Sequence, residues 1–132
     1  LGSTAESLTP MGSIYGLCRL FRLDEAVTAS LLPKSVTTPI AISVSQSLGG
    51  IQAITVVAVI ITGILGSIFA PLLIKLFRVK DPVAAGLAIG ACSHAVGTSK
   101  ALELGETEGA MSGLAIGVCG ILTVVISLFL VP

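Results

Sequence analysis

The chain has 132 residues, of which 54% are hydrophobic and only 11% are charged, and its mean hydropathy is +1.07. Soluble domains carry about 25% charged residues, so this chain has too few charges to cover itself with a polar surface. Its formal net charge is zero and its basic residues are scattered, so no nucleic-acid-binding patch is visible. The composition is that of a protein that lies in a lipid bilayer.

The start of the chain differs from the rest. Leu1–Pro10 is polar and has no hydrophobic period, and it lacks the basic and apolar regions of a signal peptide. The absence of an initial Met suggests a fragment. Met11–Leu23 is a short apolar run, which fits a truncated spanning helix or an interfacial helix. We expect these features over residues 1–23, and a transmembrane domain over residues 24–132.

The first half of that domain predicts a broken helix and then a clean one. A helical pattern opens at Asp24 and stops at Pro33; after Pro39 the pattern resumes and ends at Gly49-Gly50, so the broken helix covers residues 24–48. The clean helix is Ile51–Ile74, which reaches about 36 Å and therefore spans the ~30 Å hydrocarbon core of a bilayer.

The second half repeats this order. Asp81 and Pro82 are typical of a helix N-cap and first turn, and they open a second broken helix over residues 82–104, interrupted around Ser93–Thr98. A turn at residues 105–108 leads to the last span, residues 109–131. The fold class is therefore all-α: a polytopic membrane protein with about four membrane segments, two of them broken or re-entrant.

The basic residues predict the orientation of these segments. Arg19 and Arg22 precede the first broken helix, and Lys75, Arg78 and Lys80 precede the second, so both loops are placed in the cytoplasm. Residues 24–48 then run outward, 51–74 inward, 82–104 outward and 109–131 inward, and the two units are parallel. Re-entrant hairpins are the alternative that this rule leaves open.

The two interruptions are the candidate binding site. A broken helix in a membrane exposes backbone groups that lipid cannot satisfy, so it survives only inside protein or beside a wet cavity. Each new helix N-terminus points a partial positive charge into its break, and two such ends facing one another favour a small anion. The predicted substrate-binding residues are Lys34, Ser35, Thr37, Thr38, Ser93, Thr98 and Lys100. The alternative is a pair of kinked helices whose hydroxyls bond to carbonyls and whose lysines reach the interface.

His94 is the single histidine and lies inside an apolar segment. An ionisable residue there suggests a functional role, and its ordinary pKa suits proton coupling near neutral pH. The alternative is a neutral histidine that donates to a carbonyl. Gly86, Gly90 and His94 share one helix stripe, which predicts that the histidine faces another helix. Cys92 and His94 alone do not make a metal site, and we predict no metal or cofactor.

Several segments together resemble the C-terminal part of the LrgB/CidB family. They are Leu31–Gly50, Val56–Gly66, Arg78–Gly90 and Ser93–Gly117, in order and nearly without gaps. Two differences from the family are the missing N-terminal half and Lys100 in place of a frequent arginine.

The resemblance implies a multi-pass protein of the bacterial inner (plasma) membrane, with the lipid bilayer, an LrgA/CidA-type membrane protein and further copies of itself as partners. Two functions follow. The first is transport of a small monocarboxylate such as pyruvate, glycolate or glycerate, with His94 as the proton-coupling residue. The second is antiholin-like regulation of murein hydrolase activity and cell lysis. The sequence contains no paired carboxylates, nucleophile–base set or cofactor motif, so we do not expect an enzyme.

Overall fold

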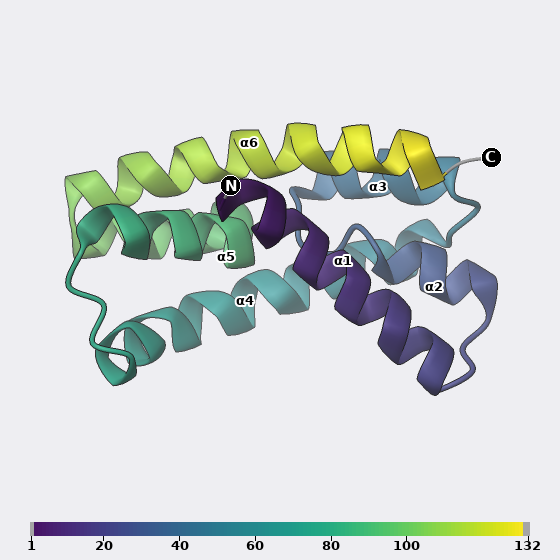
Figure 1. Ribbon diagram of the computed structural model, residues 1–132, viewed down its shortest axis with the longest axis horizontal. Coiled ribbons are helices and arrows are strands. Elements are labelled where there is room, and N and C mark those ends of the chain that lie inside the picture. The colour runs from purple at the N-terminus through teal and green to yellow at the C-terminus, as the bar shows by residue number, and fades with distance from the viewer. Residues whose placement is uncertain (1, 131–132) are drawn as a thin grey trace.

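A computed structural model describes the backbone of residues 2–130 and the side chains of residues 8–129. This part of the chain is all-helical, as predicted (Figure 1). Its six helices are α1 (Gly2–Leu20), α2 (Glu25–Leu31), α3 (Thr38–Ser47), α4 (Gln52–Leu76), α5 (Pro82–Leu104) and α6 (Glu106–Leu130).

Two of the described helices, α4 and α6, are long and apolar enough to cross a membrane. Most of the α4 surface is exposed, and large aliphatic side chains such as Ile60, Ile64 and Ile68 lie on it at four-residue spacing. The outer face of α6 is similar, with Ile121 and Leu128 both exposed. Faces of this size and polarity are unstable in water and suit contact with lipid. The structure therefore supports membrane residence through two of the predicted segments.

Helix α1 includes most of the polar segment at the start of the chain, for which the sequence predicted no helix. It begins at Gly2 and continues through Pro10 to Leu20. Met11, Ile14 and Cys18 follow one another at helical spacing and are buried against the rest of the molecule. Packing of this face stabilises the helix although its first turns have a weak pattern and contain a proline.

Helices α2 and α3 form a hairpin rather than one broken span. The backbone N–H of Ile51, beside the start of α4, donates to Ser30 Oγ at 2.6 Å, so the end of α2 lies level with the start of α4. Beyond α2 the chain runs along α4, because Val36 packs in one cluster with Val59. Helix α3 then returns, and Ser45 hydrogen-bonds Thr55 near the start of α4. The tip of this first hairpin is residues 33–37.

Helix α5 also folds back, at His94. The backbone at His94 has φ 40° and ψ −137°, which no helix contains. A Cβ on Gly97 would lie 3.0 Å from Ile89 Cγ2, and Ile89 shares a cluster with Ala101. Residues eight and twelve apart along a straight helix would be about 12 and 18 Å apart. Residues 82–93 and 95–104 are therefore the two antiparallel arms of a second hairpin. We call them α5a and α5b.

The hairpins enter from opposite ends of the molecule (Figure 1). The first opens toward the α3–α4 turn and the second toward the start of α6, where Gly86 of α5a lies against Glu108. Each hairpin is followed by a long helix, and α4 and α6 run in opposite directions. The prediction of two parallel units is therefore wrong, because a segment that turns back inverts the unit that follows it.

This geometry also corrects the predicted orientation of the loops. Arg19 and Arg22 border the same groove as Leu48, at the end where α3 meets α4. Lys75 lies in the last turn of α4 and Lys80 in the loop that follows, at the end of the molecule where α6 begins (Figure 1). The two basic segments that were placed together on one side of the membrane thus lie at opposite ends of the helices.

Candidate functional site

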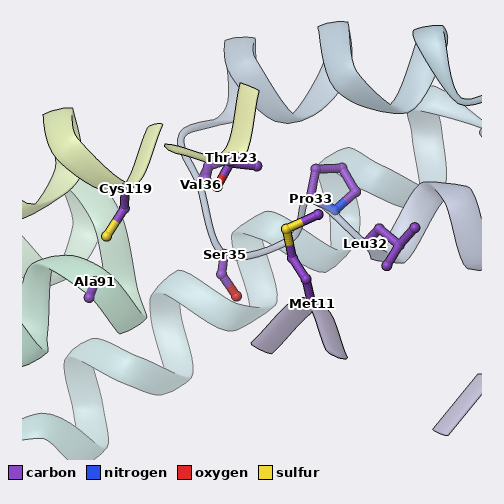
Figure 2. Close-up of a pocket in the computed structure, with 8 residues that line it drawn as sticks. All are labelled: Met11, Leu32, Pro33, Ser35, Val36, Ala91, Cys119 and Thr123. Carbon is purple, nitrogen blue, oxygen red and sulfur yellow. The ribbon is translucent and has the colours of Figure 1, made fainter. Parts of the chain in front are cut away.

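The tips of the two hairpins meet near the middle of the molecule. Ser35 and Val36 of the first tip line a small cavity with Ala91, which is three residues before the reversal in α5 (Figure 2). The cavity holds only about 10 Å³, which is room for one water molecule. Its other lining residues come from α1, the end of α2 and its continuation, and α6: Met11, Leu32, Pro33, Cys119 and Thr123. The two tips therefore border one cavity, which is too small for a ligand larger than water.

Lys34 is the predicted cation of the first interruption, and its side chain is half-buried at the first tip. His94, the predicted histidine of the second interruption, lies at the second tip, 60 positions further along the chain. Ser35, next to Lys34, and Ala91, three residues before His94, line one cavity, so the two segments occupy the same region of the molecule.

His94 occupies a backbone conformation that favours glycine. A residue with positive φ and strongly negative ψ resembles the first central position of a type II′ turn, where glycine dominates. The His94 side chain is only 4% exposed, and its Nε2 has no hydrogen-bond partner among the described residues. The alternative of a satisfied histidine therefore does not hold for Nε2. Strain of this kind concentrates at functional sites.

Two glycines of α4 make room for the second tip. A Cβ on Gly63 would lie 2.8 Å from His94 Cε1, and a Cβ on Gly66 would overlap the side chain of Ser93. Neither glycine was among the predicted site residues. The Gly-x-x-Gly spacing in an apolar helix was a signal for close approach, although it could not reveal which residue approaches.

Two helix N-termini point into the contact between the tips. Helix α3 begins at Thr38 and α5b begins after His94. The cap of α3 is Thr37, and the Thr37 hydroxyl makes no capping hydrogen bond. The first N–H groups of a helix have no acceptor inside it. Both ends therefore direct partial positive charge toward the tips.

The remaining predicted residues have different surroundings. Ser93 is buried against α4 beside His94. Thr98 lies one turn beyond the tip, where its hydroxyl donates to the His94 carbonyl at 3.0 Å and shares a 2.7 Å hydrogen bond with Ser112 of α6. Lys100 forms an ion pair with Glu103, and its side chain is 38% exposed. The structure therefore brings the tip that carries Lys34 and Ser35 near the tip that carries Ser93 and His94. Lys100 pairs with Glu103 instead.

The glycine stripes have unequal roles. Gly86 and Gly90 of α5a touch the α6 backbone, since a Cβ at either position would overlap the carbonyl of Glu108 or Ser112. Gly113 and Gly117 of α6 face open space instead. The predicted stripe at Gly86, Gly90 and His94 also splits, because the reversal at His94 turns the ring toward α4.

The described residues contain no group of three or more side chains that could hold a metal ion. An α-helical membrane protein with two hairpins that meet between two apolar helices is the class that this fold and site define. The chain belongs to the LrgB-like family, whose model matches residues 1–132.

Its relatives include proteins of known name. The chain is 43% identical to the antiholin-like protein LrgB of Bacillus mycoides (strain KBAB4) over 119 residues, which are 90% of this chain and 52% of that protein. It is 45% identical to the uncharacterized protein YxaC of Bacillus subtilis (strain 168) over 114 residues, 85% of this chain and 50% of that one. The chain thus spans about half the length of these curated relatives. No solved structure matches it.

Proposed function

We propose that this chain acts as an antiholin-like protein of the LrgB type, which restrains murein hydrolase activity and cell lysis from within the bacterial inner membrane. The observation that carries the proposal is membership of the LrgB-like family together with 43% identity to a relative named antiholin-like. The two apolar helices support residence in a membrane. The proposal requires multi-pass insertion and gives the chain no catalytic step and no cofactor.

Such a regulator would act by assembly, with an LrgA/CidA-type membrane protein and with further copies of this chain. The tight α5–α6 contact at Gly86 and Gly90 gives the assembly a rigid unit. The open space beside Gly113 and Gly117 on α6 offers a partner helix a surface that it can approach closely.

The experiment measures lysis in a Bacillus strain that lacks its own LrgB. Expression of this chain should slow the loss of culture turbidity after detergent treatment and reduce murein hydrolase activity in the medium. Gly90→Leu should abolish this effect, because the side chain would separate α5 from α6, while Lys34→Ala should retain it. Equal amounts of each variant in the membrane are the control. Lysis as fast as in the empty-vector strain, with the chain present in the membrane, contradicts the proposal.

Transport of a small monocarboxylate is a second candidate, and the meeting of the two hairpin tips favours it. We infer that both hairpins are re-entrant and that their tips bind the carboxylate of pyruvate, glycolate or glycerate. The Lys34 ammonium and the N-termini of α3 and α5b would attract the anion. Hydroxyls nearby would orient it, and His94 would carry the coupled proton. The hydroxyls are those of Ser35, Thr37, Thr38, Ser93 and Thr98.

The size of the cavity between the tips sets a condition for transport. A space of about 10 Å³ does not admit a three-carbon acid, so the tips must separate before one binds. Because the hairpins open toward opposite ends, withdrawal of either tip would expose the other to one side of the membrane. Alternating access then follows from the inverted arrangement.

Uptake of labelled pyruvate and glycolate into proteoliposomes tests this candidate. Lys34→Ala should reduce uptake at least tenfold, since a buried charge–charge contact with the substrate is lost. Lys100→Ala is the matched control: it removes a lysine that already pairs with Glu103, and it should leave uptake unchanged. Equal uptake by the chain and by its Lys34→Ala variant contradicts the proposed site.

A further inference from the structure

A broad groove lies between α1 and α2, and it shares Met11 and Leu32 with the small cavity at the hairpin tips. It encloses about 850 Å³, within the range of volumes that bind small molecules. One wall is α1, the other is α2, and the ends of α3 and α6 contribute Leu48 and Ile126. Most of the lining is apolar, and the charged residues in it are Arg19, Arg22 and Glu25.

The α1 wall has the dimensions of one membrane leaflet. Leu8, Met11, Tyr15 and Arg19 line the groove and recur every three or four residues, which places them on one face of the helix. The eleven-residue interval from Leu8 to Arg19 corresponds to about 16 Å, close to half of the ~30 Å hydrocarbon core. The groove is thus apolar over the depth of one leaflet and basic at one end.

The charge at that end selects the ligand. Arg19 and Arg22 are both exposed, and with Glu25 the groove lining has a net positive charge. The Arg19 guanidinium lies 5.7 Å from the centre of the Tyr15 ring, an arrangement that holds it beside the apolar wall. Basic pockets between membrane helices bind anionic lipid headgroups.

We propose that this groove binds an anionic phospholipid, with the headgroup phosphate on Arg19 and Arg22 and one acyl chain along Tyr15, Met11 and Leu8. A guanidinium group can donate two parallel hydrogen bonds to a phosphate. The headgroup of a zwitterionic lipid carries a cationic group beside its phosphate, whereas the headgroup of an anionic lipid has no such group to repel the arginines. The headgroup end of this groove, at Arg19 and Arg22, does not line the cavity at the hairpin tips, and the proposal does not depend on the function proposed for the tips.

The single tyrosine allows a direct test. The chain has one Tyr and no Trp, and Tyr15 is 51% exposed in the groove, so fluorescence of the protein reports on this position. The full chain is reconstituted into phosphatidylcholine vesicles that contain a small, fixed fraction of lipid with brominated acyl chains, which quench fluorescence at short range. The brominated lipid is phosphatidylglycerol in one series and phosphatidylcholine in the other.

Brominated phosphatidylglycerol should quench at a fraction about tenfold lower than brominated phosphatidylcholine does. The double variant Arg19→Gln/Arg22→Gln should remove this preference. Lys75→Gln/Lys80→Gln, which changes two cations outside the groove, should keep it. Equal quenching by both lipids overturns the proposal, and so does a preference that survives in the arginine variant. Absence of quenching by either lipid also overturns it, because a second protein chain then covers Tyr15. Unchanged circular dichroism confirms that the variants fold.

Discussion

His94 has a backbone conformation that costs a non-glycine residue about 1–3 kcal/mol. A histidine stands at this strained position although the chain contains 15 glycines, any of which would be unstrained there. The imidazole must therefore contribute something that a glycine at the same turn would lack. Its Nε2 is buried and has no hydrogen-bond partner among the described residues, so it is available to a ligand or a proton.

Substitution at this position separates the backbone strain from the role of the ring. Both His94→Gly and His94→Ala remove the imidazole, but only the first relieves the strain. We expect the free energy of unfolding of His94→Gly to exceed that of His94→Ala by about 1 kcal/mol. In thermal unfolding in detergent, His94→Gly should therefore have the higher midpoint. Equal midpoints would contradict a strained backbone at position 94.

The glycines of α4 give a second prediction at this scale. A Cβ at position 66 would overlap Ser93, and one at position 63 would press on His94, so Gly66→Ala and Gly63→Ala should each destabilise the fold by about 1–3 kcal/mol. Gly113→Ala is the matched control because nothing lies within 4 Å of its Cβ. It should be neutral or slightly stabilising in the same unfolding assay. A control that destabilises as much as Gly66→Ala would argue against this packing.

At the scale of elements, each hairpin is joined to the long helix that follows it by one hydrogen bond between two hydroxyls. In the first unit Thr55 Oγ1 of α4 donates to Ser45 Oγ of α3 at 2.7 Å. In the second unit the pair is Thr98 of α5b and Ser112 of α6, also at 2.7 Å. A hydroxyl–hydroxyl hydrogen bond at the equivalent place in both units is consistent with an inverted repeat.

Double-mutant cycles measure these two bonds. The pairs are Ser45→Ala with Thr55→Val and Thr98→Val with Ser112→Ala, and unfolding free energy is the readout. We expect a coupling energy of about 0.6 kcal/mol in each cycle, because hydrogen bonds between membrane helices have that average strength. Additive effects in both cycles would mean that neither bond stabilises its unit.

The identity and order of the elements could largely be predicted from the sequence, whereas their direction could not. Asp81 and Pro82 mark the start of α5, and Asp81 Oδ1 does accept a hydrogen bond from the Val83 N–H at 3.0 Å. The reversal at His94 has no such mark, because its neighbours Ser93 and Ala95 are common inside helices. The sequence also singled out Lys34 and His94 as candidates, but the glycines of α4 that pack against the second tip depend on a long-range contact that no local pattern contains.

At the scale of the whole molecule, the hairpins change which segments share a side of the membrane. Position 80 precedes α5 and position 107 begins α6, and the hairpin brings both to one end of the molecule (Figure 1). Four crossings would separate them. The inverted arrangement and the four-crossing arrangement therefore differ in whether positions 80 and 107 lie on the same side of the membrane.

Labelling of single cysteines distinguishes the two arrangements. In a chain whose three native cysteines are replaced by alanine, Lys80→Cys and Thr107→Cys should react with a membrane-impermeant maleimide from the same side. Gly49→Cys should react from the opposite side. Labelling of position 107 from the same side as position 49 would support the four-crossing arrangement and contradict the inverted one.

The account as a whole depends on contact between the two hairpin tips, and cross-linking measures that contact directly. Ser35→Cys and Ala91→Cys line the same cavity, so a short thiol cross-linker should join them in intact membranes, detected by mass spectrometry of the linked peptides. Ser35→Cys with Thr107→Cys is the control pair and should not link. The absence of a 35–91 link, when both cysteines react with maleimide after denaturation, would contradict a shared site between the tips.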